Sequence, residues 1–99
     1  MALPWKTVWI TGASTGIGAS VARQLAEAGV SVAISARNAQ TLGILAVANH
    51  NLKSYPLDVT DSAKVAATFA EIESQLGPVD LVIAAAGTYT PASAADFRA

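Results

Sequence analysis

A glycine-rich turn near the N-terminus has the residue types and the spacing that hold a phosphate. It reads Thr11-Gly12-Ala13-Ser14-Thr15-Gly16-Ile17-Gly18 and stands between an apolar run and a segment of helical periodicity. Gly12 allows a tight turn out of a strand, Gly16 leaves space for a pyrophosphate, and Gly18 lets the helix lie close to the sheet. The N–H groups at the helix start and the hydroxyls of Ser14 and Thr15 are the expected phosphate donors.

A second group of candidate residues follows the next apolar run. In dinucleotide-binding folds an acidic residue about 20 positions past the glycines bonds the ribose 2′-hydroxyl and selects NAD. Here Ala36 takes that place, followed by Arg37 and Asn38. A guanidinium can grip a 2′-phosphate through two parallel hydrogen bonds, with Ser35 and Asn38 as secondary donors. The pattern predicts NADP(H), with NAD as the alternative.

Two other nucleotide sites fit these residues poorly. The glycine turn lacks the Gly-Lys-Ser/Thr ending of a nucleotide triphosphatase loop, so no lysine reaches the phosphates. A methyltransferase domain that binds S-adenosylmethionine would favour an acidic residue at the end of the second strand, where Ala36 and Arg37 stand. A stand-alone nucleotide-binding or regulatory module without catalysis stays open.

The candidate residues need a parallel sheet to bring them together. Four apolar runs predict strands over residues 7–10, 30–36, 52–57 and 79–83, and helical segments over 16–28, 39–48 and about 61–76 lie between them. The resulting βαβαβαβ order predicts the N-terminal half of a three-layer, doubly wound α/β fold of the Rossmann type. Its expected strand order is 3-2-1-4.

Helical spacing predicts which side chains pack against this sheet. In the first helix they are Ile17, Val21, Leu25 and Ala28, and in the third helix they are Val65, Phe69, Ile72 and Leu76. Asp61 or Thr60 is the expected N-cap of the third helix, and Gly77-Pro78 its end.

The spacing of the glycine turn resembles that of the short-chain dehydrogenase/reductase family. The family fingerprint TGxxxGIG is matched by Thr11, Gly12, Gly16, Ile17 and Gly18, and the resemblance extends from about Lys6 to Gly87. It implies that Asp58, with the backbone of Val59, contacts the adenine.

The same resemblance implies that Ala84-Ala85-Ala86-Gly87 corresponds to an Asn-Asn-Ala-Gly motif that lines the cofactor. Both asparagines are alanine in this sequence, so their side-chain hydrogen bonds are absent, whereas Ala86 and Gly87 still permit close approach. Ala85, Ala86 and Gly87 therefore join the predicted cofactor-binding residues.

The family's chemistry is hydride transfer between a nicotinamide and a carbonyl or alcohol, with a catalytic Tyr-x-x-x-Lys pair, a serine and an asparagine. Neither tyrosine fits, because Tyr55 is followed four residues on by Val59 and Tyr89 by Ser93. No catalytic residue is predicted. Residues 1–99 are expected to be a partial NAD(P)-binding domain that is inactive without its C-terminal half, and the longer protein is expected to be a homo-oligomer.

The composition of the sequence indicates which classes of partner the protein is not expected to bind. Six Lys/Arg and seven Asp/Glu are spread singly, and 53% of the residues are hydrophobic. Without a basic run or a stretch of about 20 apolar residues, we expect no nucleic-acid or membrane partner and a cytoplasmic location. The sequence contains no cysteine, and His50 is predicted to be a solvated turn residue with no second ligand near it, so no metal site is predicted. Trp5 and Trp9 are predicted to be packing or interface anchors.

Overall fold

The computed structural model describes residues 4–12 and 16–84. Strands and helices alternate along this part of the chain: β1 (Thr7–Thr11), α1 (Gly16–Glu27), β2 (Ser31–Ser35), α2 (Ala39–Val47), β3 (Leu52–Ser54), α3 (Ser62–Leu76) and β4 (Leu81–Ala84). The βαβαβαβ order predicted from the apolar runs is confirmed.

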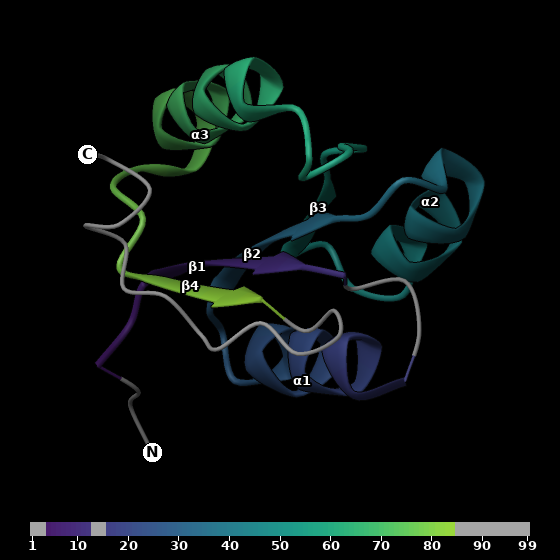
Figure 1. Cartoon of the computed structure of the whole chain (residues 1–99). Coiled ribbons are helices and arrows are strands. Elements are labelled where there is room, and N and C mark those ends of the chain that lie inside the picture. Colours follow the sequence, from purple (N-terminus) through teal and green to yellow (C-terminus); the bar gives the residue numbers. More distant parts are fainter. Residues whose placement is uncertain (1–3, 13–15, 85–99) are drawn as a thin grey trace.

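The four strands form one parallel sheet in the order β3-β2-β1-β4 (Figure 1). Trp9 of β1 is in register with Ala33 of β2, and Thr11 is in register with Ser35. The predicted strand order is therefore confirmed. Because the strands are parallel, their carboxyl ends lie along one edge of the sheet.

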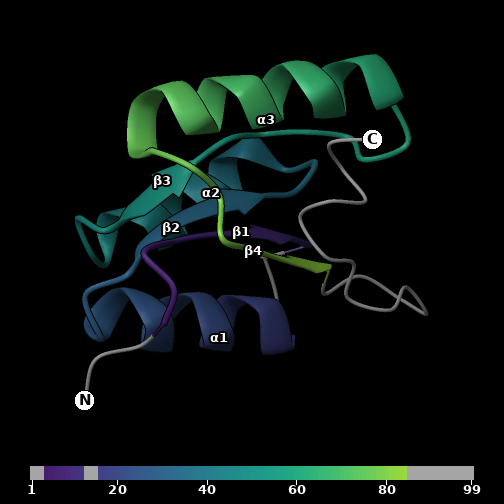
Figure 2. The ribbon, with the colours of Figure 1, turned by 90° about the vertical axis from the view of Figure 1, so that its left-hand side faces the viewer.

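Helices cover both faces of this sheet, with α1 below and α3 above it in Figure 2. On the face covered by α1 and α2, the buried strand residues are aliphatic: Val8, Ile10, Val32, Ile34 and Leu52. On the face covered by α3, Trp9 and Ala33 pack with Phe69 and Ile72. The alternation of side chains along each strand thus divides the core into two clusters.

The buried face of α1 differs from the predicted one. Its buried residues are Gly18, Ala22 and Ala26, whereas Ile17 is 79% exposed. Val21 and Leu25 pack at the margin of the cluster. A stripe of small residues brings a helix closer to a sheet than larger side chains allow, and this shifts the contact away from Ile17 and Ala28.

The strand boundaries also differ from the prediction, by one residue at the ends of β1 and β2 and by more in β3 and β4. The third strand ends at Ser54 instead of Leu57, although Tyr55 N bonds Ile34 O at 2.8 Å and Leu57 N bonds Ala36 O at 3.0 Å beyond it. The fourth strand begins at Leu81 instead of Val79, because Val79 N donates to Glu73 Oε2 at 2.9 Å.

The predicted face of α3 is confirmed: Phe69 and Ile72 are buried, with Val65 and Leu76 packed beside them. Of the two candidate N-caps, Asp61 is the one observed, since its Oδ1 accepts from Lys64 N at 3.2 Å. Within the described ranges, no helix is long and apolar enough to cross a membrane.

Candidate functional site

Three of the predicted groups lie at the carboxyl edge of the sheet. The glycine turn starts after β1, Arg37 and Asn38 follow β2, and Asp58 and Val59 follow β3. These segments come from adjacent strands, so the fold collects them at one place. Ser14, Thr15, Ala85, Ala86 and Gly87 lie outside the described residues.

The two described ends of the glycine turn have backbone conformations that favour glycine. Gly12 has a φ of 72° and Gly16 a φ of 58°, both in the left-handed region where a Cβ is unfavourable. Gly12 N donates to Ser35 O at 2.8 Å, which joins the turn to the end of β2. Among the described residues, no atom lies within 4 Å of a Cβ built on Gly16, so the space beside it is open to a ligand.

Helix α1 begins directly at Gly16, and no acidic residue lies in its first turn. The first N–H groups of a helix have no partner within it, and the helix dipole places partial positive charge there. Ile17 is exposed at this end, while the buried Gly18 lets the helix approach the sheet. The arrangement suits an anionic group such as a pyrophosphate.

The end of β2 presents a cation and no acid. Ala36 is half-buried and Arg37 is exposed. Asn38 is the N-cap of α2, and its Oδ1 accepts from Thr41 N at 3.0 Å. This cap was not foreseen, although an asparagine directly before a helical segment is a recognisable signal for it.

Ser35 does not have the predicted role of a donor to a 2′-phosphate. Its side chain is fully buried, and its Oγ accepts from Trp9 Nε1 at 2.8 Å. The alternation of the strand turns this residue into the core, toward α3 and away from the edge.

Thr60, one of the two predicted N-cap candidates of α3, instead bonds the side chain of Asp58. Asp58 Oδ1 accepts from Thr60 N at 3.0 Å and from Thr60 Oγ1 at 2.7 Å. These hydrogen bonds lower the pKa of Asp58, and the positive charges of Arg37 and Lys64 act in the same direction. The effect of Arg37 on the pKa of Asp58 agrees with the placement of both residues at the carboxyl edge of the sheet. Val59, next to Asp58, is 49% exposed.

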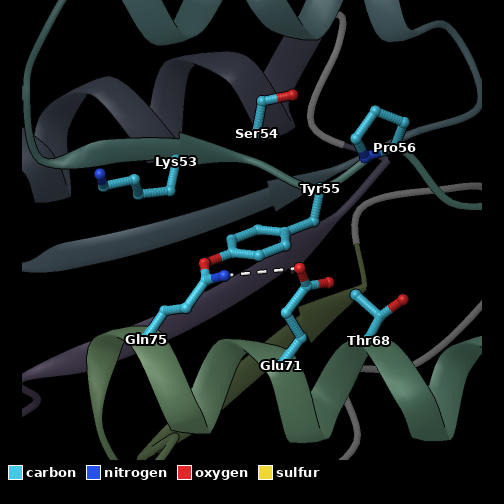
Figure 3. A pocket seen from close by; sticks show the side chains of 7 residues that line it. All are labelled: Lys53, Ser54, Tyr55, Pro56, Thr68, Glu71 and Gln75. Atoms are coloured by element: carbon cyan, nitrogen blue, oxygen red, sulfur yellow. Dashed lines mark hydrogen bonds between the residues drawn. The ribbon is translucent and has the colours of Figure 1, made fainter.

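A separate pocket of about 240 Å³ lies between β3 and α3 (Figure 3). Tyr55 forms part of its wall and is itself buried, with its hydroxyl donating to Gln75 Oε1 at 2.5 Å. Gln75 Nε2 in turn donates to Glu71 Oε2 at 3.4 Å. Burial raises the pKa of Tyr55, and the charge of Glu71 adds to that effect. Tyr55 is therefore a packing residue, and its hydroxyl stays protonated near neutral pH.

The structure also places the two tryptophans and the histidine for which the sequence predicted no chemical role. Trp9 is fully buried, and Trp5 packs against the aliphatic cluster, which confirms both as packing residues. His50 is exposed in a turn, as predicted. Among the described residues, no group of three or more His, Asp or Glu side chains is placed to hold a metal ion.

The family model described as short chain dehydrogenase matches residues 6–99. The chain belongs to the short-chain dehydrogenase/reductase family. The resemblance carried by the glycine turn is thereby confirmed, and it includes the βαβαβαβ order and the parallel sheet described above.

Curated short-chain dehydrogenases and reductases are similar to this chain. It is 37% identical over 90 residues to 2,3-dihydro-2,3-dihydroxybenzoate dehydrogenase of Bacillus subtilis, which covers 87% of this chain and 34% of that protein. It is 40% identical over 86 residues to (-)-isopiperitenone reductase of Mentha piperita, covering 79% of this chain and 27% of the relative. The chain thus spans about a third or less of the length of these relatives.

Solved structures of the family share the fold. A β-ketoacyl-[ACP] reductase from Bacteroides thetaiotaomicron has a TM-score of 0.76 and 34% identity, over 85% of this chain and 42% of its own. A variant of actinorhodin polyketide ketoreductase solved with NADPH has a TM-score of 0.78 and 28% identity, over 83% of this chain and 33% of its own.

Proposed function

We propose that this chain is the NADP(H)-binding part of a short-chain oxidoreductase that interconverts a carbonyl and an alcohol. The observation that carries the proposal is the end of β2, where Ala36 and the exposed Arg37 stand beside the glycine turn. An uncharged residue at this place avoids repulsion of a 2′-phosphate, and the guanidinium supplies paired donors to it. The ketoreductase neighbour solved with NADPH supports this choice.

The described residues fit a dinucleotide in three places. The open space at Gly16 and the start of α1 would receive the pyrophosphate. Arg37 would hold the 2′-phosphate, with the side-chain amide nitrogen of Asn38 as a second donor, because its oxygen caps α2. Asp58 and the backbone of Val59 would contact the adenine. Bound NADP(H) supplies or accepts a hydride, and the residues of this chain hold and orient it.

Arg37→Ala tests the assignment most directly. We expect NADPH affinity to fall on the order of tenfold, because a charge-assisted bidentate contact is lost, while NADH affinity changes little. Isothermal titration of both cofactors measures the difference. Arg23→Ala, which removes an exposed arginine from the middle of α1, is the matched control and should leave both affinities unchanged. Equal losses for NADPH and NADH in Arg37→Ala would refute the NADP assignment.

We further propose that the 99 residues do not catalyse turnover by themselves. They contain no Tyr-x-x-x-Lys pair, and the hydroxyl of the buried Tyr55 is bonded to Gln75 of α3. The pure chain should therefore bind NADPH but not oxidise it with carbonyl substrates, as followed by NADPH absorbance. Sustained oxidation would contradict this proposal.

The lack of that pair also suits the second candidate, a nucleotide-binding or regulatory module without catalysis. Reading the encoding nucleic acid beyond the codon for Ala99 separates the two. An open frame that encodes Tyr-x-x-x-Lys supports the oxidoreductase, and a stop codon supports the module.

A further inference from the structure

A buried side-chain hydrogen bond joins β1 to the end of β2, close to the carboxyl edge of the sheet where we propose that the cofactor binds. Trp9 Nε1 donates to Ser35 Oγ at 2.8 Å, and both side chains are fully buried. Trp9 is in register with Ala33, two residues before Ser35. Because Ala33 is small, the indole extends past it and reaches the last residue of β2.

The indole that makes this bond is itself anchored. The rings of Trp9 and Phe69 lie with their centroids 6.0 Å apart at an interplanar angle of 42°. Phe69 belongs to α3, the helix that covers this face of the sheet. The position of Ser35 is thus fixed by the packed core as well as by the backbone hydrogen bonds of β2.

Ser35 also makes the backbone contact to the glycine turn. Its carbonyl oxygen accepts from Gly12 N at 2.8 Å. One residue is therefore bonded through its side chain to β1 and α3 by way of Trp9, and through its carbonyl to the turn proposed to hold the pyrophosphate.

Arg37 lies two residues beyond Ser35, between two neighbours that are also bonded. Ala36 O accepts from Leu57 N at 3.0 Å, and Asn38 caps α2. The Arg37 side chain is exposed, so its range of positions is set by the backbone on which it stands. Ser35 is the last fully buried residue of this backbone before Arg37.

We propose that Trp9 and Ser35 are a positioning pair that sets the separation between the glycine turn and Arg37. The pair thereby favours a dinucleotide with a 2′-phosphate, a role that rests on the proposed NADP(H) function. NADPH must satisfy the turn and Arg37 at the same time, so it gains from a defined separation. NADH needs only the turn and the adenine contacts, so it gains less.

The test uses the 99-residue chain with Ser35→Ala, which removes the acceptor, and Trp9→Phe, which removes the indole N–H but keeps a ring. Titrations give the ratio of NADPH to NADH affinity, and thermal unfolding gives Tm. We expect each variant to lower the ratio on the order of fivefold, and the double variant to lower it no further, because both act through one bond.

Val82→Ala is the matched control, since it truncates a fully buried residue of the same cluster, in register with Trp9 on β4, without removing either partner of the Trp9–Ser35 hydrogen bond. It should lower Tm and leave the cofactor ratio unchanged. If Ser35→Ala and Trp9→Phe behave like Val82→Ala, the bond only stabilises the core and the positioning role is overturned. If the unchanged chain shows no preference for NADPH, the cofactor assignment is overturned, and the positioning role fails with it.

Discussion

The two ends of the parallel sheet use their polar groups differently. At the amino end, Asp80 Oδ2 accepts from Lys6 N at 2.8 Å and from Thr7 N at 3.0 Å. Thr7 Oγ1 also donates to Leu76 O at 3.3 Å. At the carboxyl end, Arg37 is exposed, and the described residues leave open space beside Gly16, where α1 begins.

This difference shows where stability and binding are separated in the molecule. Bonds at the amino end join the start of β1 to β4 and α3, so they contribute to folding. Donors and charges at the carboxyl end are positioned by the fold but directed outward, which suits a ligand. Substitutions at the two ends should therefore have separable effects.

The largest expected effect is on binding, from Gly16→Ala at the carboxyl end. A φ of 58° disfavours alanine by about 1–2 kcal/mol. The added methyl group also enters the open space beside the turn, so we expect NADPH affinity to fall on the order of a hundredfold. Titration calorimetry measures this loss.

Gly43→Ala is the control for that substitution. Gly43 lies inside α2, has no positive φ, and a Cβ built on it meets no atom within 4 Å. Alanine should stabilise this helix slightly and leave binding intact. Retention of full NADPH affinity by Gly16→Ala would show that the turn does not hold the pyrophosphate.

An intermediate effect, on stability alone, is expected from Asp80→Ala at the amino end. The substitution removes the acceptor of two backbone hydrogen bonds, and the free energy of unfolding should fall by about 2 kcal/mol. Denaturant unfolding measures the change, and Asp80→Asn, which keeps one side-chain oxygen, should lose less. A parallel loss of NADPH affinity in the folded variant would break the separation between the two ends.

The smallest effect concerns the pH dependence of the carboxyl end. The pKa of Asp58 is lowered chiefly by hydrogen bonds from Thr60, so this contribution to stability is present above the ordinary Asp pKa of about 4. It is lost as the pH falls through the lowered value. Thr60→Val removes the hydroxyl donor and should raise the pKa of Asp58 toward its ordinary value.

An NMR titration of the Asp58 carboxyl carbon measures that shift, and Thr68→Val on α3 is the control. An unchanged Asp58 titration in Thr60→Val would mean that the hydroxyl at 2.7 Å does not stabilise the carboxylate.

Local patterns in the sequence determined most of the architecture. Four apolar runs and three helical periodicities predicted the element order, and the TGxxxGIG turn predicted the family, because these signals lie within short stretches of chain. They could not predict which side of α1 faces the sheet. That side depends on how closely the stripe of Gly18, Ala22 and Ala26 can approach the strands.

The same distinction between local sequence signals and tertiary contacts applies to the residues of the candidate site. Residue types and their order along the chain determined the glycine turn, Arg37 and Asp58 as candidates. The roles of Ser35 and Thr60 follow from contacts in the folded chain: Ser35 turns into the core and bonds Trp9, and Thr60 holds Asp58 and does not cap α3. The physical reason is that a hydroxyl takes its role from the partner within hydrogen-bond reach. For Ser35 that partner lies 26 positions away along the chain and comes near only when the sheet forms.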